Sequence, residues 1–279
     1  MSLEFLLDDV KAHKELVDVL DSESYASFES YFISVGGAIK KTLDWITNNH
    51  TTAEMADPIS LASHMKTLEK MGFSALADVN VYKPPFAKTD WISYSKVLLE
   101  QTTQFSNLEF RLYAPFQEYL ERAVALEGYH NKPITDRKFV HIDAVKARKQ
   151  FERVNVNEDK IEELEAAQAT VKFQKTFRSI RQLQDVEKLV FHIHETLATV
   201  NLDSLKKREV LILKEVDTLL DRIEADEKED LTPAAKKQLA VTMMNIAEET
   251  EYLAMLLFYS NQTIAAWNDT AVKLRKIEP

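Results

Sequence analysis

The chain has 279 residues, of which 45% are hydrophobic, so it is long enough for two modest domains and apolar enough to form a core. Its 35 Lys and Arg residues against 45 Asp and Glu residues give a net charge of −10, which excludes a broad basic field for nucleic acid or anionic membranes. The absence of cysteine excludes disulfides, thiolate catalysis and cysteine zinc sites.

Glycine is scarce, with four residues in the whole chain. Average usage would give roughly twenty glycines in a chain of this length. Tight turns in sheets, Rossmann crossovers and phosphate-binding loops need glycine, because it alone adopts positive φ freely. Long helices joined by few turns do not need it, so the composition predicts an all-α protein.

Apolar residues at helical spacing predict two helices at the start of the chain, over residues 4–21 and from a serine cap at 22 or 24 to about residue 48. Gly36-Gly37 lies inside the second helix, where we expect close packing against a neighbouring backbone, with a kink as the alternative. Asp57-Pro58 predicts the start of a third helix that ends at Gly72, because proline suits the first helical turn.

Residues 73–88 lack a helical period and contain two adjacent prolines, which predicts a loop packed on the body. Thr89 or Asp90 then caps a long helix that reaches about residue 126. Pro115 is expected to kink this helix, because proline lacks the N–H that the helical ladder requires.

Gly128–Pro133 is the clearest linker, and we place the domain boundary in it. The predicted organisation is a compact N-terminal helical domain (1–128), a linker and basic segment (129–157), and an elongated C-terminal helical bundle (158–279) with coiled-coil-like packing. Within that bundle the periodicity predicts helices from residue 158, over 177–200 and over 203–225.

The last predicted helix, residues 233–275, is the best-defined element. Thr232 is a suitable N-cap, Pro233 suits the first turn, and no further Gly or Pro occurs before Pro279. Apolar residues recur every 3.5 residues, as a helix needs in order to lie along another helix. The predicted interface residues on this seam are Leu239, Met243, Ile246, Leu253, Leu257, Ile264, Trp267 and Leu274.

Two polar residues, Thr250 and Ser260, interrupt this seam, which favours packing inside a bundle over a two-stranded coiled coil. Glu248, Glu249 and Glu251 flank the seam and are expected to face solvent. The pattern leaves open whether the seam packs within the molecule or between molecules.

Basic residues form a second candidate site, for phosphate or an acidic partner. The members of this candidate patch are Arg148, Lys149, Arg153, Lys172, Lys175, Arg178 and Arg181. The favoured alternative is that they pair with the acidic blocks at 158–165 and 215–230, because such alternation is typical of salt-bridged long helices. We therefore expect no strong binding of nucleic acid.

No catalytic or cofactor motif is present: the chain has no Gly-x-Ser-x-Gly, no His-Glu-x-x-His, no Walker loop and no Rossmann fingerprint. His192 and His194 are two residues apart, which on a helix places them about 200° apart and disfavours a shared metal. We therefore expect no enzyme activity, no cofactor and no metal site.

One resemblance is carried by Met1–Glu4 (MSLE), by Ser27–Phe32 (SFESYF) and by Tyr82–Phe86 (YKPPF) leading into Asp90–Tyr94 (DWISY). These segments resemble the poorly characterised helical structural proteins of large tailed bacteriophages. The resemblance covers mainly residues 1–110 and transfers no functional residue. It implies a virion or assembly component.

Together these features predict a structural or assembly protein that acts through helix–helix contacts with itself or with protein partners. The alternative is a helical regulatory module that binds a cellular or host protein. The N-terminus has no basic region followed by an apolar run, and the longest strongly apolar run is far shorter than a membrane span. We therefore expect a soluble protein, cytoplasmic where it is made, or in the virion if the phage resemblance holds.

Overall fold

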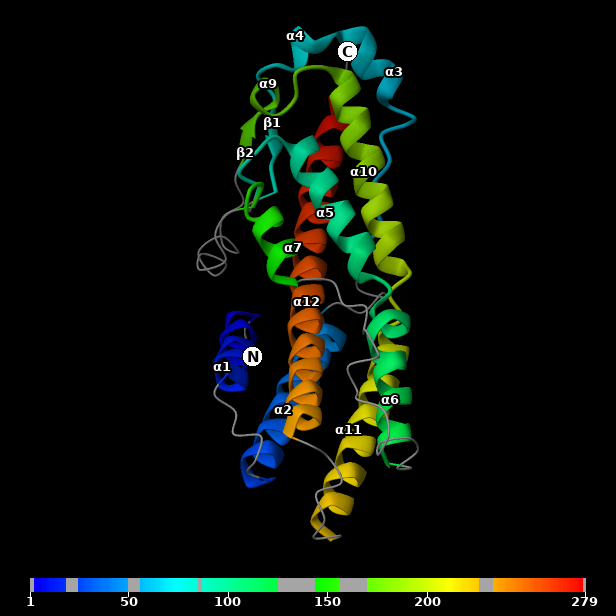
Figure 1. Ribbon diagram of the computed structural model, residues 1–279. Coiled ribbons are helices and arrows are strands. Elements are labelled where there is room, and N and C mark those ends of the chain that lie inside the picture. Colours follow the sequence, from blue (N-terminus) through cyan, green and yellow to red (C-terminus); the bar gives the residue numbers. More distant parts are fainter. Residues whose placement is uncertain are drawn as a thin grey trace. The chain divides into compact units, whose positions relative to one another are not determined.

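The computed structural model describes residues 3–18, 25–49, 56–84, 87–124, 144–155, 170–225 and 233–277. Helices make up most of this part, and its sheet has two short strands, so the all-α prediction is confirmed (Figure 1). The predicted linker Gly128–Pro133 and the helix expected from residue 158 lie outside the described residues.

The chain divides into two units, and each unit draws on three separate stretches of sequence. Unit 1 comprises residues 1–49, 107–144 and 201–254, and unit 2 comprises residues 50–106, 145–200 and 255–279. This division differs from the predicted consecutive parts 1–128, 129–157 and 158–279. The chain passes from one unit to the other five times, so a break in sequence pattern is not a break in packing.

Unit 1 is a bundle in which α2 packs against α1 and α11, and α11 also packs against α6. The apolar residues predicted on the inner face of α2, such as Phe32, Val35 and Ile46, are each at most 2% exposed. The elements of unit 1 before its last helix are α1 (Leu3–Asp18), α2 (Tyr25–Asn49), η1 (Glu109–Tyr113), α6 (Ala114–Val124) and α11 (Leu202–Ala225).

Unit 2 has the helix pair α5 and α10 in contact and a two-stranded antiparallel sheet. Strand β1 pairs with β2, with Val81 opposite Val171. The elements of unit 2 before its last helix are α3 (Met65–Met71), α4 (Phe73–Leu76), β1 (Asn80–Tyr82), α5 (Trp91–Phe105), α7 (Ala144–Phe151), β2 (Thr170–Lys172), α9 (Phe173–Thr176) and α10 (Ile180–Ala198).

The last helix, α12 (Pro233–Arg275), has the predicted bounds and contributes to both units. Its residues up to Ala254 belong to unit 1 and those from Met255 belong to unit 2. Residues 249–260 are all buried, more than three helical turns without an exposed position. This part of α12 is therefore a core helix, covered on every side and not only along the predicted seam.

The predicted third helix is shorter than expected. Residues 56–60 are not helical, and α3 begins at Met65 rather than at Asp57-Pro58. Side chains of α10 and α12 bond the backbone of residues 57–61, for example Glu187 with the Leu61 N–H, which satisfies the groups that a helix would otherwise pair. The residues predicted as a loop, 73–88, contain α4 and β1.

The break near Pro115 takes a specific form. Helix α5 begins as predicted after Asp90, which accepts a hydrogen bond from the Ser93 N–H, but it ends at Phe105. The wider π-helical turn η1 follows, closed by the Ala114 N–H donating to the Glu109 carbonyl, and α6 starts at Ala114. Because Pro115 has no N–H, the ladder has to be re-formed here, and a π turn is a common way to do so.

Candidate functional site

The predicted interface residues of α12 lie in the core of the chain itself. Each of the eight, Leu239, Met243, Ile246, Leu253, Leu257, Ile264, Trp267 and Leu274, is at most 2% exposed. The polar interruption at Thr250 is accommodated, because its hydroxyl bonds the Ile246 carbonyl and the Tyr113 hydroxyl. Side chains already covered by their own chain offer no area to a partner, so a surface for other molecules has to be sought elsewhere.

The solvent-facing interpretation of the glutamates beside the seam is wrong for two of the three. Glu249 is 1% exposed and Glu251 is 3% exposed, because α12 is enclosed on every side at this point. Glu248 is half-buried and accepts a hydrogen bond from Lys14 at 2.5 Å.

The junction of α2 and α11 in unit 1 carries the first candidate surface. Gly36 of α2 faces Leu213 of α11 so closely that a Cβ atom at Gly36 would lie 2.7 Å from the Leu213 Cδ2 atom. Further along, the Lys206 ammonium bonds the Asp44 carboxylate at 2.7 Å. The helices are therefore antiparallel, since the residue number rises on α2 as it falls on α11. The packing at Gly36 is therefore close, but against a leucine side chain and not against the predicted neighbouring backbone.

Each helix places one large aliphatic side chain beside this junction and leaves it exposed. On α2, Ile33 is one turn from Gly37 and is 61% exposed. On α11, Val210 is one turn from both Lys206 and Leu213 and is 57% exposed. We call the surface formed by Ile33, Gly37, Val210 and Leu213 the outer groove.

Gly37 leaves open space at the outer groove. A Cβ atom built at Gly37 meets no atom within 4 Å, whereas the neighbouring Gly36 is in tight contact. The two glycines therefore serve different purposes, one allowing α11 to approach and the other leaving open space on the outside. Two exposed aliphatic side chains on adjoining helices, with open space at Gly37, are suited to contact with apolar side chains of another molecule.

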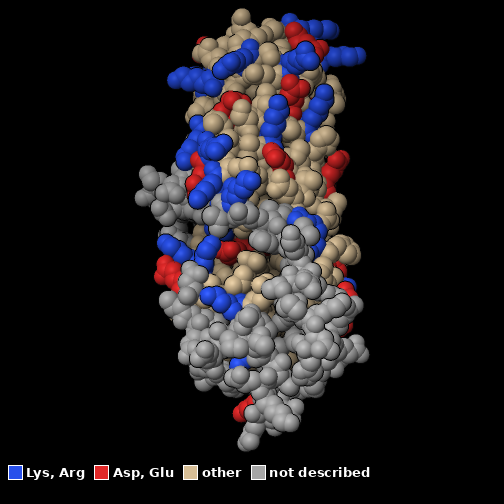
Figure 2. Space-filling view, viewed as in Figure 1, with Lys and Arg blue, Asp and Glu red and all other residues tan. Residues whose placement is uncertain are grey.

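The predicted basic patch lies on unit 2. Its residues belong to α7 and the turn after it, to β2 and α9, and to the start of α10, and Figure 2 shows Lys and Arg side chains gathered over this region. Within the described part of the chain, no carboxylate is within ion-pair distance of Lys149, Arg153, Lys172, Lys175, Arg178 or Arg181. The expected pairing with the acidic blocks stays a prediction, because the block 158–165 lies outside the described residues and the block 215–230 belongs to unit 1.

Two members of this patch have defined local roles. The Lys172 ammonium donates to the Asp78 carbonyl at 2.8 Å, which fastens β2 to the turn before β1. Burial raises the pKa of Asp90, but hydrogen bonds from Ser93 and the charge of Arg178 outweigh it, so the pKa of this N-cap is lowered.

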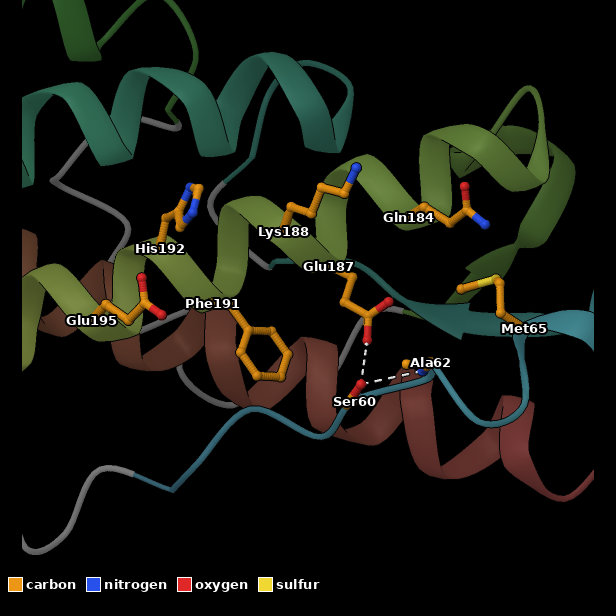
Figure 3. Close-up of a pocket in the computed structure, with 9 residues that line it drawn as sticks. All are labelled: Ser60, Ala62, Met65, Gln184, Glu187, Lys188, Phe191, His192 and Glu195. Atoms are coloured by element: carbon orange, nitrogen blue, oxygen red, sulfur yellow. Dashed lines mark hydrogen bonds between the residues drawn. The ribbon is translucent and has the colours of Figure 1, made fainter.

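An open groove of about 560 Å³ lies in unit 2 between α10 and residues 60–65. One wall is formed by Ser60, Ala62 and Met65, and the other by Gln184, Glu187, Lys188, Phe191, His192 and Glu195 of α10. Figure 3 shows Glu187 directed at the opposite wall, where it accepts hydrogen bonds from the Ser60 hydroxyl at 3.0 Å and the Leu61 N–H at 2.6 Å. This groove carries polar and apolar groups side by side.

The two histidines noted in the sequence separate as helical geometry requires. His192 lines the groove, whereas His194 lies 3.4 Å from the Asp57 carboxylate. Over the residues that the structure describes, no group of three His, Asp or Glu side chains is placed to hold a metal ion.

Comparison with known proteins returns no match: no family model, no curated protein and no solved structure is similar to this chain. None of the helices among the described residues is long and apolar enough to cross a membrane.

Sequence reasoning did not find the outer groove. Ile33 and Val210 were counted with neither the predicted seam nor the predicted patch, because single aliphatic residues on helices are expected to be buried. The usable signal was the pair Gly36-Gly37. In this helix the first glycine allows close packing on one side, and the second leaves open space on another.

Proposed function

We propose that this protein is a non-enzymatic structural or assembly protein whose contacts with other molecules use the outer groove of α2 and α11. The single observation that carries this proposal is the pair of exposed aliphatic side chains, Ile33 and Val210, on two packed helices with open space at Gly37. A helix–helix contact was expected of this chain, and the outer groove supports it better than the α12 seam, which is buried.

The proposed occupant is a second copy of the chain. Most soluble oligomers are homo-oligomers with two-fold symmetry, in which the same surface is used on both subunits. The outer groove suits such a contact, because each of its antiparallel helices contributes one exposed aliphatic residue and the groove is therefore close to self-complementary. Two copies would bring four helices together, an arrangement that packs well.

Sedimentation velocity across a range of protein concentrations tests this proposal. The wild-type protein should sediment as a dimer, and Ile33→Glu or Val210→Glu should weaken association at least about ten-fold, equivalent to about 1.4 kcal/mol. Val272→Glu is the matched control, because Val272 is 39% exposed on α12 within unit 2 and the chemical change is the same. A wild-type protein that stays monomeric, or variants that dimerise as well as the control, would contradict the proposal.

The same two variants separate the narrower versions of the function when the composition of a particle or of a co-purified complex is measured. If the chain is a virion component, as the phage resemblance implies, it should be present at fixed stoichiometry in a particle, and the two variants should be missing from that particle. If it is instead a regulatory module, the wild-type protein should be monomeric and should co-purify with one other protein, and the same two variants should release that protein.

A further inference from the structure

Residues 57–61, which we call the strap, are held in unit 2 almost entirely by side chains of other elements. Asn268 of α12 bonds the strap twice: its Oδ1 accepts from the Ile59 N–H at 2.7 Å and its Nδ2 donates to the Asp57 carbonyl at 3.1 Å. The indole N–H of Trp267 donates to the Ile59 carbonyl at 2.8 Å.

Two more backbone groups of the strap are bonded in the same manner. The Arg275 guanidinium donates to the Ser60 carbonyl, and Glu187 of α10 accepts from the Leu61 N–H. Side chains from two helices thus bond five backbone groups in five residues. Most backbone groups in proteins pair with other backbone groups, so this arrangement resembles a bound peptide more than an ordinary connection.

Two strap side chains anchor it, and the rest remain accessible. Pro58 is buried and Leu61 is 0% exposed, whereas Ile59 and Ser60 are half-buried. The side chain of Asp57 is 93% exposed. The strap therefore has the properties of an extended ligand that is recognised by its backbone and by a proline and a leucine three residues apart.

We propose that the cradle formed by Glu187, Trp267, Asn268 and Arg275 is a binding site for an extended segment of another protein with the pattern Pro-x-x-Leu, and that the strap is its internal competitor. The open groove beside the strap gives such a segment an approach, because Ser60 forms one of its walls (Figure 3). This proposal does not rest on the outer groove, which belongs to unit 1.

The tethered strap sets the strength of this competition. A short tether gives an effective concentration in the millimolar range, so a free segment of equal intrinsic affinity binds weakly to the wild-type protein. The apparent affinity equals the intrinsic affinity multiplied by the fraction of molecules whose cradle is vacant. Weakening the strap without altering the cradle should therefore increase binding of a free peptide.

The test uses the full chain carrying Leu61→Ala and a fluorescent peptide that copies residues 56–62 (ADPISLA). The peptide supplies the leucine that the variant lacks, so it should bind at least about ten-fold more tightly than to the wild-type protein and should raise the variant's melting temperature. A peptide with Ala in place of its Pro and Leu, and the double variant Leu61→Ala/Asn268→Ala, are the controls, and neither should show binding. A folded Leu61→Ala variant that does not bind the peptide overturns the proposal.

If Leu61→Ala does not fold, hydrogen exchange of the wild-type protein in the presence of the peptide tests the proposal. Millimolar peptide should displace the strap and accelerate hydrogen exchange of the Ile59 and Leu61 amides several-fold, since their acceptors Asn268 and Glu187 are then occupied by the peptide. Unchanged exchange at both amides would overturn the proposal.

Discussion

Units 1 and 2 are both helical, yet their interiors are chemically different. Every charged side chain that is buried in the described part of the chain lies in unit 1, including Glu109, Glu209, Glu249 and Glu251. The buried polar residues that the structure describes in unit 2 are all neutral, and its interior is rich in aromatic rings, with Trp91 stacked on Phe177. Amphipathic helices therefore form a core that contains buried charged side chains in unit 1 and a core of neutral side chains in the described part of unit 2.

The overall charge follows the same division. Unit 1 has 17 Lys and Arg against 28 Asp and Glu, whereas unit 2 has 18 against 17. The acidic character of the chain thus belongs to unit 1. Buried carboxylates make stability depend on pH, and a neutral aromatic core does not. The two units should accordingly respond differently to core substitutions and to pH.

The largest effect is expected in the aromatic core of unit 2. Trp267 is 0% exposed, packs edge-on against Trp91 at 6.1 Å and donates to the Ile59 carbonyl. Trp267→Ala should lower the free energy of unfolding by about 3–5 kcal/mol, measured by chemical denaturation. Trp267→Phe keeps a ring but removes the N–H, so its loss should be smaller. Equal losses for both variants would show that the ring contributes little.

In unit 1 we expect the free energy of unfolding to fall when a buried apolar residue is truncated. We expect it to fall also when a buried charged residue is truncated, which a neutral core does not offer. Leu253→Ala should cost about 2–5 kcal/mol, because Leu253 is fully buried in α12. Glu251→Ala should cost about 1–3 kcal/mol, since truncating a buried charged group leaves its surroundings unsatisfied. Thermal and chemical unfolding of both variants measure this. If the free energy of unfolding of Glu251→Ala were within about 0.5 kcal/mol of the wild-type value, Glu251 would behave as a solvent-facing residue, which would contradict this prediction.

The pH dependence of unit 1 should be visible at Glu209. Burial, and then the nearby Asp44 carboxylate, raise the pKa of Glu209, while Lys40 and Lys206 act in the opposite direction. Its Oε1 atom has no hydrogen-bond partner among the described residues. The charge of Glu209 also raises the pKa of Tyr113, for which burial is the largest cause.

A raised folded-state pKa means that the folded protein binds this proton more tightly than the unfolded chain. The stability contributed by protonated Glu209 is therefore full below the unfolded value of 4.5 and is lost as pH rises through the folded pKa. Glu209→Gln should increase the melting temperature at pH 7 and leave it nearly unchanged at pH 4. Glu100→Gln, at an exposed position on α5 in unit 2, is the control and should change neither.

The smallest expected effect on stability comes from removing either of two buried hydroxyl groups on α12, and its sign should differ between them. Thr250 in unit 1 is bonded to Tyr113, whereas the buried hydroxyl of Ser260 in unit 2 has no partner within the described residues. Ser260→Ala should be neutral or stabilise by up to about 1 kcal/mol, because it removes an unsatisfied group. Thr250→Val should instead destabilise. Differential scanning calorimetry of the two variants measures this, and a large loss for Ser260→Ala would assign that hydroxyl a partner.

The elements with strong local signals were the ones that sequence predicted best. The bounds of α12 were predicted because Pro233 marks its start and no later Gly or Pro interrupts it. The helix start predicted at Asp57-Pro58 was wrong, although the local sequence is typical of one. The residues that hold the strap in its extended form, Glu187 and Asn268, are more than a hundred residues away in sequence.

The two cores could not be told apart from the sequence for a related reason. A glutamate on an amphipathic helix is expected to face solvent, and only the packing of other helices around α12 buries Glu249 and Glu251. Gly36 is the opposite case, since glycine inside a helix has few uses other than close approach. Ile33 and Val210 gave no such signal, because their spacing fits an inner face as well as an outer one.

Hydrogen exchange along α12, measured at two protein concentrations a hundred-fold apart, tests the central claim that this helix is the core of its own chain and that other molecules contact the outer groove. The amides of residues 246–264 should be among the slowest to exchange, and their protection should not change on dilution. Amides of α2 beside Ile33 should lose protection as the dimer dissociates. Protection of α12 that disappears on dilution, with α2 unaffected, would show instead that the α12 seam is the contact between copies.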